Sequence, residues 1–153
     1  MSIQEWGPIT WYLFHTLAEK IKDEYFEIEL PNILNNIRII CNILPCPECK
    51  EHALYYLKTA NVNKIKTKDQ LKLFLLYFHN EVNARNNKKL FTFEELNKKY
   101  STARLKVIIG LFFQIYNKKS GNMRLQLSTG MEKNIVLNNF THYIKKNIYK
   151  YNY

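Results

Sequence analysis

Residues 67–85 read TKDQLKLFLLYFHNEVNAR and carry the clearest periodic pattern in the chain. The apolar residues that recur at steps of three and four are Leu71, Leu75, Phe78 and Val82. This spacing is typical of an α-helix with one buried face. Thr67 and Asp69 supply polar side chains that stabilise a helix N-terminus. The stretch therefore predicts a helix that packs into a helical core.

Similar spacing predicts helices on both sides of this stretch. The expected ranges are 6–21, 31–44, 45–57 and 92–100. Pro31 and Pro45 each suit a first helical turn, where the missing N–H has no partner to lose. Gly and Pro number only four each, which argues against a fold rich in turns. We expect an all-α fold over residues 1–100, a four-helix bundle with a short fifth helix.

Residues 101–153 are predicted to form a separate basic and partly apolar helical extension. The stretch 104–117 is apolar, 118–130 contains Gly121 and Gly130 and is predicted as a linker, and 135–150 has the pattern of a basic amphipathic helix. We expect the apolar stretch to be buried against the bundle or at a subunit interface. The final helix is expected to dock with its lysines in solvent, with an anionic membrane surface or an acidic partner as alternatives.

The formal charge of +10 is unevenly distributed, with 14 basic and 12 acidic residues in 1–100 but 9 basic and 1 acidic in 101–153. The charge alone suggests a nucleic-acid binder, but its confinement to the extension weakens that interpretation, and we expect no nucleic acid partner. The longest apolar run, 107–116, is too short to span a membrane. With three cysteines and no signal-like opening, the chain is expected to be cytoplasmic.

The motif Cys46-Pro47-Glu48-Cys49 is the first candidate for chemistry. Two thiols at this spacing can form a disulfide, and a helix N-terminus stabilises a thiolate at the first of them. The same pair, with Cys41 upstream and His52 downstream, is also a possible zinc ligand set. Redox chemistry, a zinc-binding interaction module and inert thiols all remain open on spacing alone.

Two further motifs place aromatic and polar side chains on one helical face. His79 and Asn83 are four residues apart, and Arg85 and Lys88 follow them, an arrangement that suits a planar base and its phosphates. A solvated helix end is the alternative. Trp11 and His15 share a face in the same way, and ordinary core packing is the alternative there.

The order and spacing of these motifs, over about residues 5–100, resemble the Erv/ALR family of FAD-linked sulfhydryl oxidases, in particular the short forms of large cytoplasmic DNA viruses. The family's W-G-P-x-x-W-x-x-L-H is similar to Trp6, Gly7, Pro8, Trp11 and His15, with Phe14 where Leu is usual. Its C-x-x-C is matched by Cys46 and Cys49, with the viral L-P and H-A at Leu44-Pro45 and His52-Ala53. Its H-N-x-V-N is matched by His79, Asn80, Val82 and Asn83, and the following lysine and aromatics by Lys88, Phe91 and Tyr100.

The resemblance implies five short helices that cradle FAD and a thiol oxidase that makes disulfides in substrate proteins. Cys46 and Cys49 are then the catalytic pair, oxygen is the electron acceptor and hydrogen peroxide the product. The implied FAD-binding residues are Trp6, Gly7, Trp11, His15, His52, His79, Asn83, Arg85, Lys88, Phe91 and Tyr100. It also implies a homodimer, no resident metal, protein dithiols or a thioredoxin-like carrier as partners, and a place in a viral cytoplasmic disulfide pathway.

The chain departs from the family pattern in two places. Asn86-Asn87 stand where many members have Leu-Gly. Once Cys46 and Cys49 are assigned to the redox pair, Cys41 is the one cysteine left, so neither the long-spaced structural disulfide of cellular members nor a second shuttle pair has cysteines to form it. We therefore expect a substrate protein to reach Cys46 directly.

Overall fold

The computed structural model describes residues 1–118 and 130–153 in full and the helical backbone of 123–129. The helices are α1 (Ile3–Lys20), α2 (Asp23–Cys41), α3 (Pro47–Thr59), α4 (Lys68–Arg85), α5 (Phe93–Ser101), α6 (Leu105–Tyr116) and α7 (Met123–Asn147). Two short 3-10 turns, η1 (Val62–Lys64) and η2 (Ile148–Lys150), complete the elements. The predicted all-α fold is confirmed.

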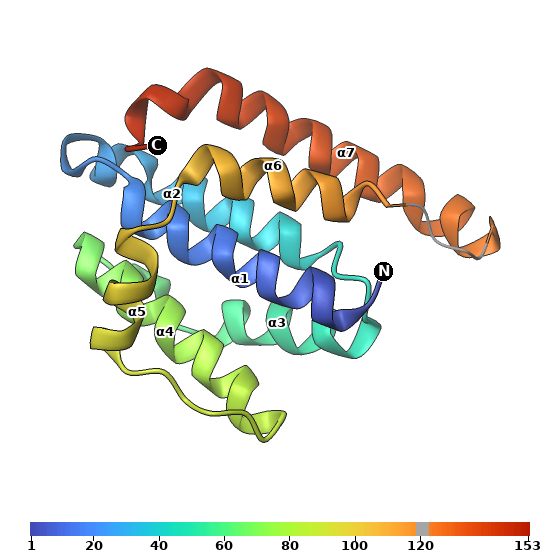
Figure 1. Ribbon diagram of the computed structural model, residues 1–153, viewed down its shortest axis with the longest axis horizontal. Helices are drawn as coiled ribbons and strands as arrows, with labels where there is room; N and C mark the ends of the chain where they lie inside the picture. The colour runs from blue at the N-terminus through green and yellow to red at the C-terminus, as the bar shows by residue number, and fades with distance from the viewer. Residues whose placement is uncertain (119–122) are drawn as a thin grey trace.

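The helices are arranged in three layers, with α1 and α2 in the middle (Figure 1). On one side α4 and α5 pack against α1 and α3 packs against α2, while on the other side α6 packs against α1 and α7 against α2. Because α1 has neighbours on both sides, Leu13, Leu17 and Ala18 are at most 1% exposed. The helix that carries Trp11 and His15 therefore lies at the centre of the core.

α2 begins at Asp23, so the prediction that it starts at Pro31 is wrong. Pro31 lies inside the helix at an exposed position. An internal proline costs roughly 3 kcal/mol because it removes a hydrogen bond and crowds the preceding turn. Phe26, Ile33 and Ile37 are buried along one face of α2, and burial contributes about 1.5–3 kcal/mol for each such side chain. Core packing on both sides of Pro31 therefore outweighs its local cost.

α6 lies along α1, which confirms the predicted burial of residues 104–117 against the bundle. Phe112 of α6 meets Phe140 of α7 with ring centroids 5.9 Å apart, edge to face.

The predicted linker over 118–130 is wrong from Met123 onward, because α7 begins there and Gly130 lies inside it. Residues 119–122, including Gly121, are outside the described residues.

The end of the chain docks on the bundle, as predicted for the final helix. Lys145 and Lys146 are exposed, whereas Lys150 Nζ lies 2.6 Å from the carboxylate of Glu29, a residue of α2 whose side chain is 1% exposed. Tyr151 also forms an isolated antiparallel bridge with Ile21. None of the described helices combines the length and apolar character needed to cross a membrane.

Candidate functional site

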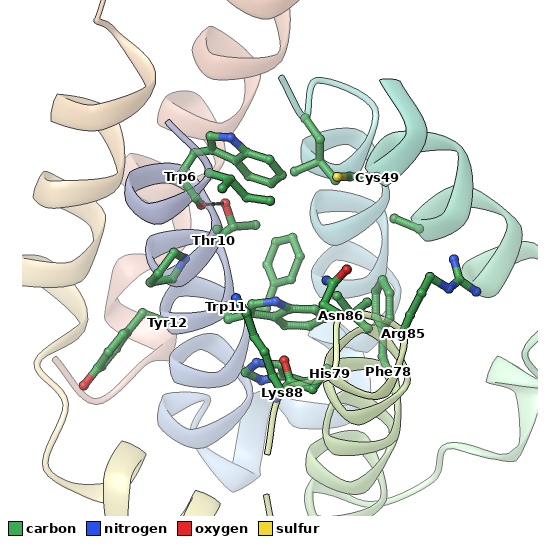
Figure 2. Close-up of a pocket in the computed structure, with 18 of the residues that line it drawn as sticks. Trp6, Thr10, Trp11, Tyr12, Cys49, Phe78, His79, Arg85, Asn86 and Lys88 are labelled. Atoms are coloured by element: carbon green, nitrogen blue, oxygen red, sulfur yellow. Dashed lines mark hydrogen bonds between the residues drawn. The ribbon is translucent and has the colours of Figure 1, made fainter. Parts of the chain in front are cut away.

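A cavity of about 610 Å³ opens between α1, α3, α4 and the loop that leads from α4 to α5. Its volume falls in the range of small-molecule and cofactor sites. In the view of Figure 2, Cys49, Trp6 and Thr10 lie toward one end, and His79 and Lys88 toward the other. A cysteine and a charged group therefore lie toward opposite ends of the cavity.

Aromatic rings form one wall of the cavity. The indole of Trp11 lies parallel to the imidazole of His79, with centroids 4.1 Å apart and an interplanar angle of 5°. His15 lies behind them and stacks on Tyr100 at 4.6 Å, and Phe91, like Tyr100 a lining residue, lies 5.1 Å from His79. Flat side chains with exposed π-faces favour a planar ligand.

His15 and His79 form a hydrogen-bonded pair, with Nε2 of His15 2.9 Å from Nδ1 of His79. Burial, together with the nearby positive charges of Lys99 and Lys88, lowers the pKa of His79 to about 4. Burial likewise lowers the pKa of His15 well below its usual value. Both imidazoles are therefore neutral at pH 7, and one donates its N–H to the other. His15 Nδ1 has no hydrogen-bond partner among the described residues.

Cations gather on the lining of the cavity. Four of the described lining residues are basic, namely Arg85, Lys88, Lys89 and Lys99, and Glu48 is the acidic one. Arg85 is 3.5 Å from Glu81, one helical turn away, and both side chains are nearly half exposed. The Lys99 ammonium lies 4.9 Å from the ring centroid of Tyr12 and 5.4 Å from that of Phe91. This excess of positive charge suits an anionic ligand such as a phosphate ester.

Two asparagines of α4 fix the loop that carries Lys88 and Lys89. Asn80 exchanges two hydrogen bonds of 2.8 Å with the backbone N–H and C=O of Phe91. Asn83 donates to the carbonyl of Lys89 at 3.1 Å while it lines the cavity. Asn87 has φ 56°, in the left-handed region that Gly and Asn adopt most readily. The left-handed turn at this position is therefore made by an asparagine, one of the residues that tolerate it best.

The cysteine pair lies at the start of α3, as predicted. Cys46 and Cys49 form a disulfide with Cα atoms 5.2 Å apart, and Cys46 is the N-cap residue. Its Sγ accepts the backbone N–H of Cys49 at 3.1 Å. Cys49 lines the cavity and Cys46 does not. One sulfur is therefore turned to the cavity, and the other begins the helix.

The alternative zinc site lacks its ligand set. In the described part of the chain, no group of three or more side chains of the metal-binding types comes together. Cys41 is a free thiol that is 1% exposed, and burial raises its pKa to about 12. Zinc binds thiolates, which neither a disulfide nor a buried neutral thiol supplies.

The model of the Erv1 / Alr family matches residues 8–101, the segment that supplies the cysteine pair and nearly all of this lining. The chain belongs to the Erv1/Alr family. Three relatives carry related names. A putative FAD-linked sulfhydryl oxidase of Invertebrate iridescent virus 3 is 33% identical over 96 residues, which are 62% of this chain and 65% of that protein. An FAD-linked sulfhydryl oxidase of Oryza sativa subsp. japonica is 32% identical over 100 residues, 65% of this chain and 51% of that protein.

An FAD-linked sulfhydryl oxidase of African swine fever virus is 32% identical over 103 residues, 67% of this chain and 86% of that protein. The chain thus spans about half of the rice relative and just under two thirds of the iridescent virus relative. No solved structure matches the chain.

The Erv1/Alr motifs converge on the cavity. The predicted residues that line it are Trp6, Gly7, Trp11, Cys49, His52, His79, Asn83, Arg85, Lys88, Phe91 and Tyr100. Two predicted residues do not line the cavity. His15 is 2% exposed and lies behind Trp11 and His79, and Cys46 is connected to the cavity by its disulfide with Cys49. Their roles in binding and catalysis stay predictions.

Other residues of the Erv1/Alr cavity were not predicted. They include Thr10, Tyr12, Phe14, Phe78, Lys89 and Lys99. Phe78 belongs to the apolar stripe of α4, which also fits a residue of the core. Lys99 is one of five lysines in residues 85–106, and its place beside three rings depends on the packing of α5 on α1. A tryptophan or histidine at helical spacing marks a site, whereas one surface lysine among many does not.

Proposed function

We propose that the protein is an FAD-dependent thiol oxidase that makes disulfide bonds in substrate proteins. The observation that carries this proposal is the position of Cys49, which is disulfide-bonded to Cys46 and lines a cavity with aromatic walls and four basic residues. The names of the relatives support the same activity.

The residues that line the cavity fit FAD. The rings of Trp11 and His79 offer flat faces to a planar ring system, and Lys88, Arg85 and Lys99 supply positive charge for a pyrophosphate. Thr10 and Trp6 line the cavity near Cys49 in the view of Figure 2. The isoalloxazine ring belongs at the Cys49 end, because electrons must pass between that sulfur and the ring.

The protein begins the reaction by thiol–disulfide exchange. A thiolate of the substrate attacks Sγ of Cys46, the bond between the two cysteine sulfurs breaks, and Cys49 leaves as a thiolate. The second substrate thiolate then attacks the substrate sulfur of the mixed disulfide, which frees Cys46 and releases the oxidised substrate. The N-terminus of α3 stabilises negative charge on Cys46, because the backbone N–H of Cys49 points at its sulfur.

Two electrons of the substrate now reside on the Cys46–Cys49 pair, and the two protons of the substrate thiols have passed to solvent. FAD, when bound, would accept these electrons and transfer them, with two protons from solvent, to oxygen, which would give hydrogen peroxide. Cys49 hands over the electrons because it is the cysteine of the pair that lines the cavity. Its disulfide with Cys46 is restored for the next substrate.

The partners belong to the same proposal. We expect a protein dithiol, such as a thioredoxin-like carrier, to reach Cys46 directly, and we expect a homodimer. We further propose a place in a viral pathway of disulfide formation in the cytoplasm, in line with the viral relatives named FAD-linked sulfhydryl oxidase.

The test compares two cysteine variants of the purified chain. The parental protein is expected to be yellow, to bind FAD and to consume oxygen when given dithiothreitol. Cys49→Ala is expected to retain the flavin spectrum and to lose turnover, because the sulfur beside the cavity is gone. Cys41→Ala is the control and is expected to keep both. A chain that cannot be reconstituted with FAD, or a Cys49→Ala variant with parental turnover, would falsify the proposal.

A further inference from the structure

Tyr116 is the last residue of α6, beyond the segment that the family model matches, and yet its hydroxyl reaches the wall of the cavity. The Tyr116 side chain is 0% exposed. Its Oη lies 2.6 Å from Oγ1 of Thr10. Thr10 lines the cavity and Tyr116 does not, so any effect of Tyr116 on a ligand passes through Thr10.

The direction of this hydrogen bond follows from the number of protons. Thr10 Oγ1 lies 2.5 Å from the carbonyl oxygen of Trp6, as the dashed line in Figure 2 shows. A carbonyl oxygen only accepts, so the single hydroxyl proton of Thr10 is used there. Tyr116 must therefore donate to Thr10. Burial raises the pKa of Tyr116, which keeps this donor protonated at neutral pH.

A second contact links the end of α6 to the same part of α1. Lys118, just beyond α6, pairs with Glu5 at 2.5 Å. The ring of Tyr116 is itself fixed, because it stacks on Phe112 with centroids 4.3 Å apart. The first turns of α1 are thus held from the side of the C-terminal extension, opposite the cavity.

We propose that Tyr116 is a positioning residue of the site. Acting through Thr10, it holds the first turns of α1 and so sets the place of Trp6 and Thr10 at the Cys49 end of the cavity. The inference rests on the proposed function, since the cavity is taken to hold FAD. It assigns to the extension a part in forming the flavin site.

The experiment measures the dissociation constant of FAD from the full-length apoprotein and the visible circular dichroism of the bound flavin. Tyr116→Phe removes the donor hydroxyl, so Thr10 Oγ1 no longer accepts a hydrogen bond from residue 116. We expect FAD affinity to fall about five- to tenfold, the equivalent of one buried hydrogen bond, and the flavin dichroism to change. Thr10→Val is expected to lower FAD affinity at least as much, because it removes this hydrogen bond together with the one from Thr10 to the Trp6 carbonyl. The double variant is expected to lose no more affinity than Thr10→Val alone, because the bond that Tyr116→Phe removes is already absent there.

Tyr143→Phe is the matched control. Tyr143 is a partly buried tyrosine of α7 whose hydroxyl bonds to Glu29 and Tyr151, and it does not line the cavity. This variant is expected to lose stability and to keep the FAD dissociation constant within twofold. If Tyr116→Phe does not fold, Thr10→Val tests the same hydrogen bond. Parental affinity and dichroism in Tyr116→Phe or Thr10→Val, or an equal loss in Tyr143→Phe, would overturn this inference alone. A parental chain that binds no FAD would overturn the proposed function as well.

Discussion

His79 is a buried base whose protonation opposes folding. Its pKa is lowered from 6.5 to about 4, so between these values the unfolded chain binds more protons than the native one. The contribution of His79 to stability is therefore constant above about pH 7.5 and falls by about 3 kcal/mol as the pH is lowered from 6.5 to 4. Urea unfolding at a series of pH values measures this loss.

The glutamine of His79→Gln does not titrate between pH 6.5 and 4. The free energy of unfolding of this variant should therefore fall by about 3 kcal/mol less over this range than that of the parental protein. His142, an exposed histidine of α7, provides the control through His142→Gln, which should follow the parental curve. A His79→Gln curve that matches the parental one would show that His79 does not carry this pH dependence.

Cys41 is chemically silent, although it lines the same cavity as Cys49. A thiol with a pKa of about 12 has almost no thiolate at neutral pH, and the side chain is 1% exposed. After gentle reduction, iodoacetamide should label Cys46 and Cys49 in the native protein and leave Cys41 unmodified, as peptide mass spectrometry can establish. Labelling of Cys41 at the rate seen in urea would contradict this expectation.

The loop between α4 and α5 depends on Asn87. A β-branched residue in its left-handed conformation is strained, so Asn87→Val should lower the free energy of unfolding by about 1–2 kcal/mol, whereas Asn87→Gly should change it little. Asn86, at φ −97°, is the control, since Asn86→Val keeps an allowed backbone. Urea unfolding provides the measurement. Equal stability of the two Asn87 variants would mean that the loop relaxes around the new residue.

The helices themselves could be predicted wherever their apolar stripe was continuous. The stripe from Leu71 to Val82 and the cap at Thr67 predicted α4, and Thr67 does accept the N–H of Gln70. Pro31 misled the prediction of α2, because the cost of proline is local and visible in the sequence while the burial that offsets it arises in the folded core. The early start of α7 was missed because glycine and polar residues there also favour a linker.

The candidate site could be predicted as far as its motifs extend. Trp11, His79 and Cys49 are recognisable because their types and spacing are unusual, and the structure brings them to one cavity. Thr10 and Lys99 were missed because their relation to the cavity comes from the packing of α1 against its neighbours. An amphipathic stripe indicates that one face of a helix is buried, but it does not indicate which other helix packs against that face.

At the scale of the whole molecule, Glu29 and Lys150 tie the end of the chain to α2. Burial opposes ionisation of Glu29, but hydrogen bonds from Lys150, Tyr143 and Asn32 outweigh it and lower its pKa. Lys150→Met leaves this carboxylate buried without its cation, and the free energy of unfolding should fall by about 3 kcal/mol at pH 7.

The contribution of Glu29 is present above its unfolded pKa near 4.5 and is lost as the pH falls through its lower native value. The difference in the free energy of unfolding between Lys150→Met and the parental protein should therefore become smaller at acidic pH. Thermal unfolding monitored by circular dichroism measures both effects. Lys146→Met, at an exposed lysine four positions earlier, should behave as the parental chain. If Lys150→Met were as stable as Lys146→Met, the ion pair of Glu29 and Lys150 would not stabilise the fold.

The docking of the chain end has a consequence for biosynthesis. Glu29 and Lys150 are 121 positions apart in the sequence, and the backbone of Lys20 and Lys22 bonds to Asn152 and Lys150. On the ribosome, α1 and α2 emerge long before the residues that cover their second face. Contacts of such long sequence separation form late in folding and leave apolar surface open in the meantime. The nascent chain therefore completes its native core only after Lys150 and Asn152 have left the exit tunnel.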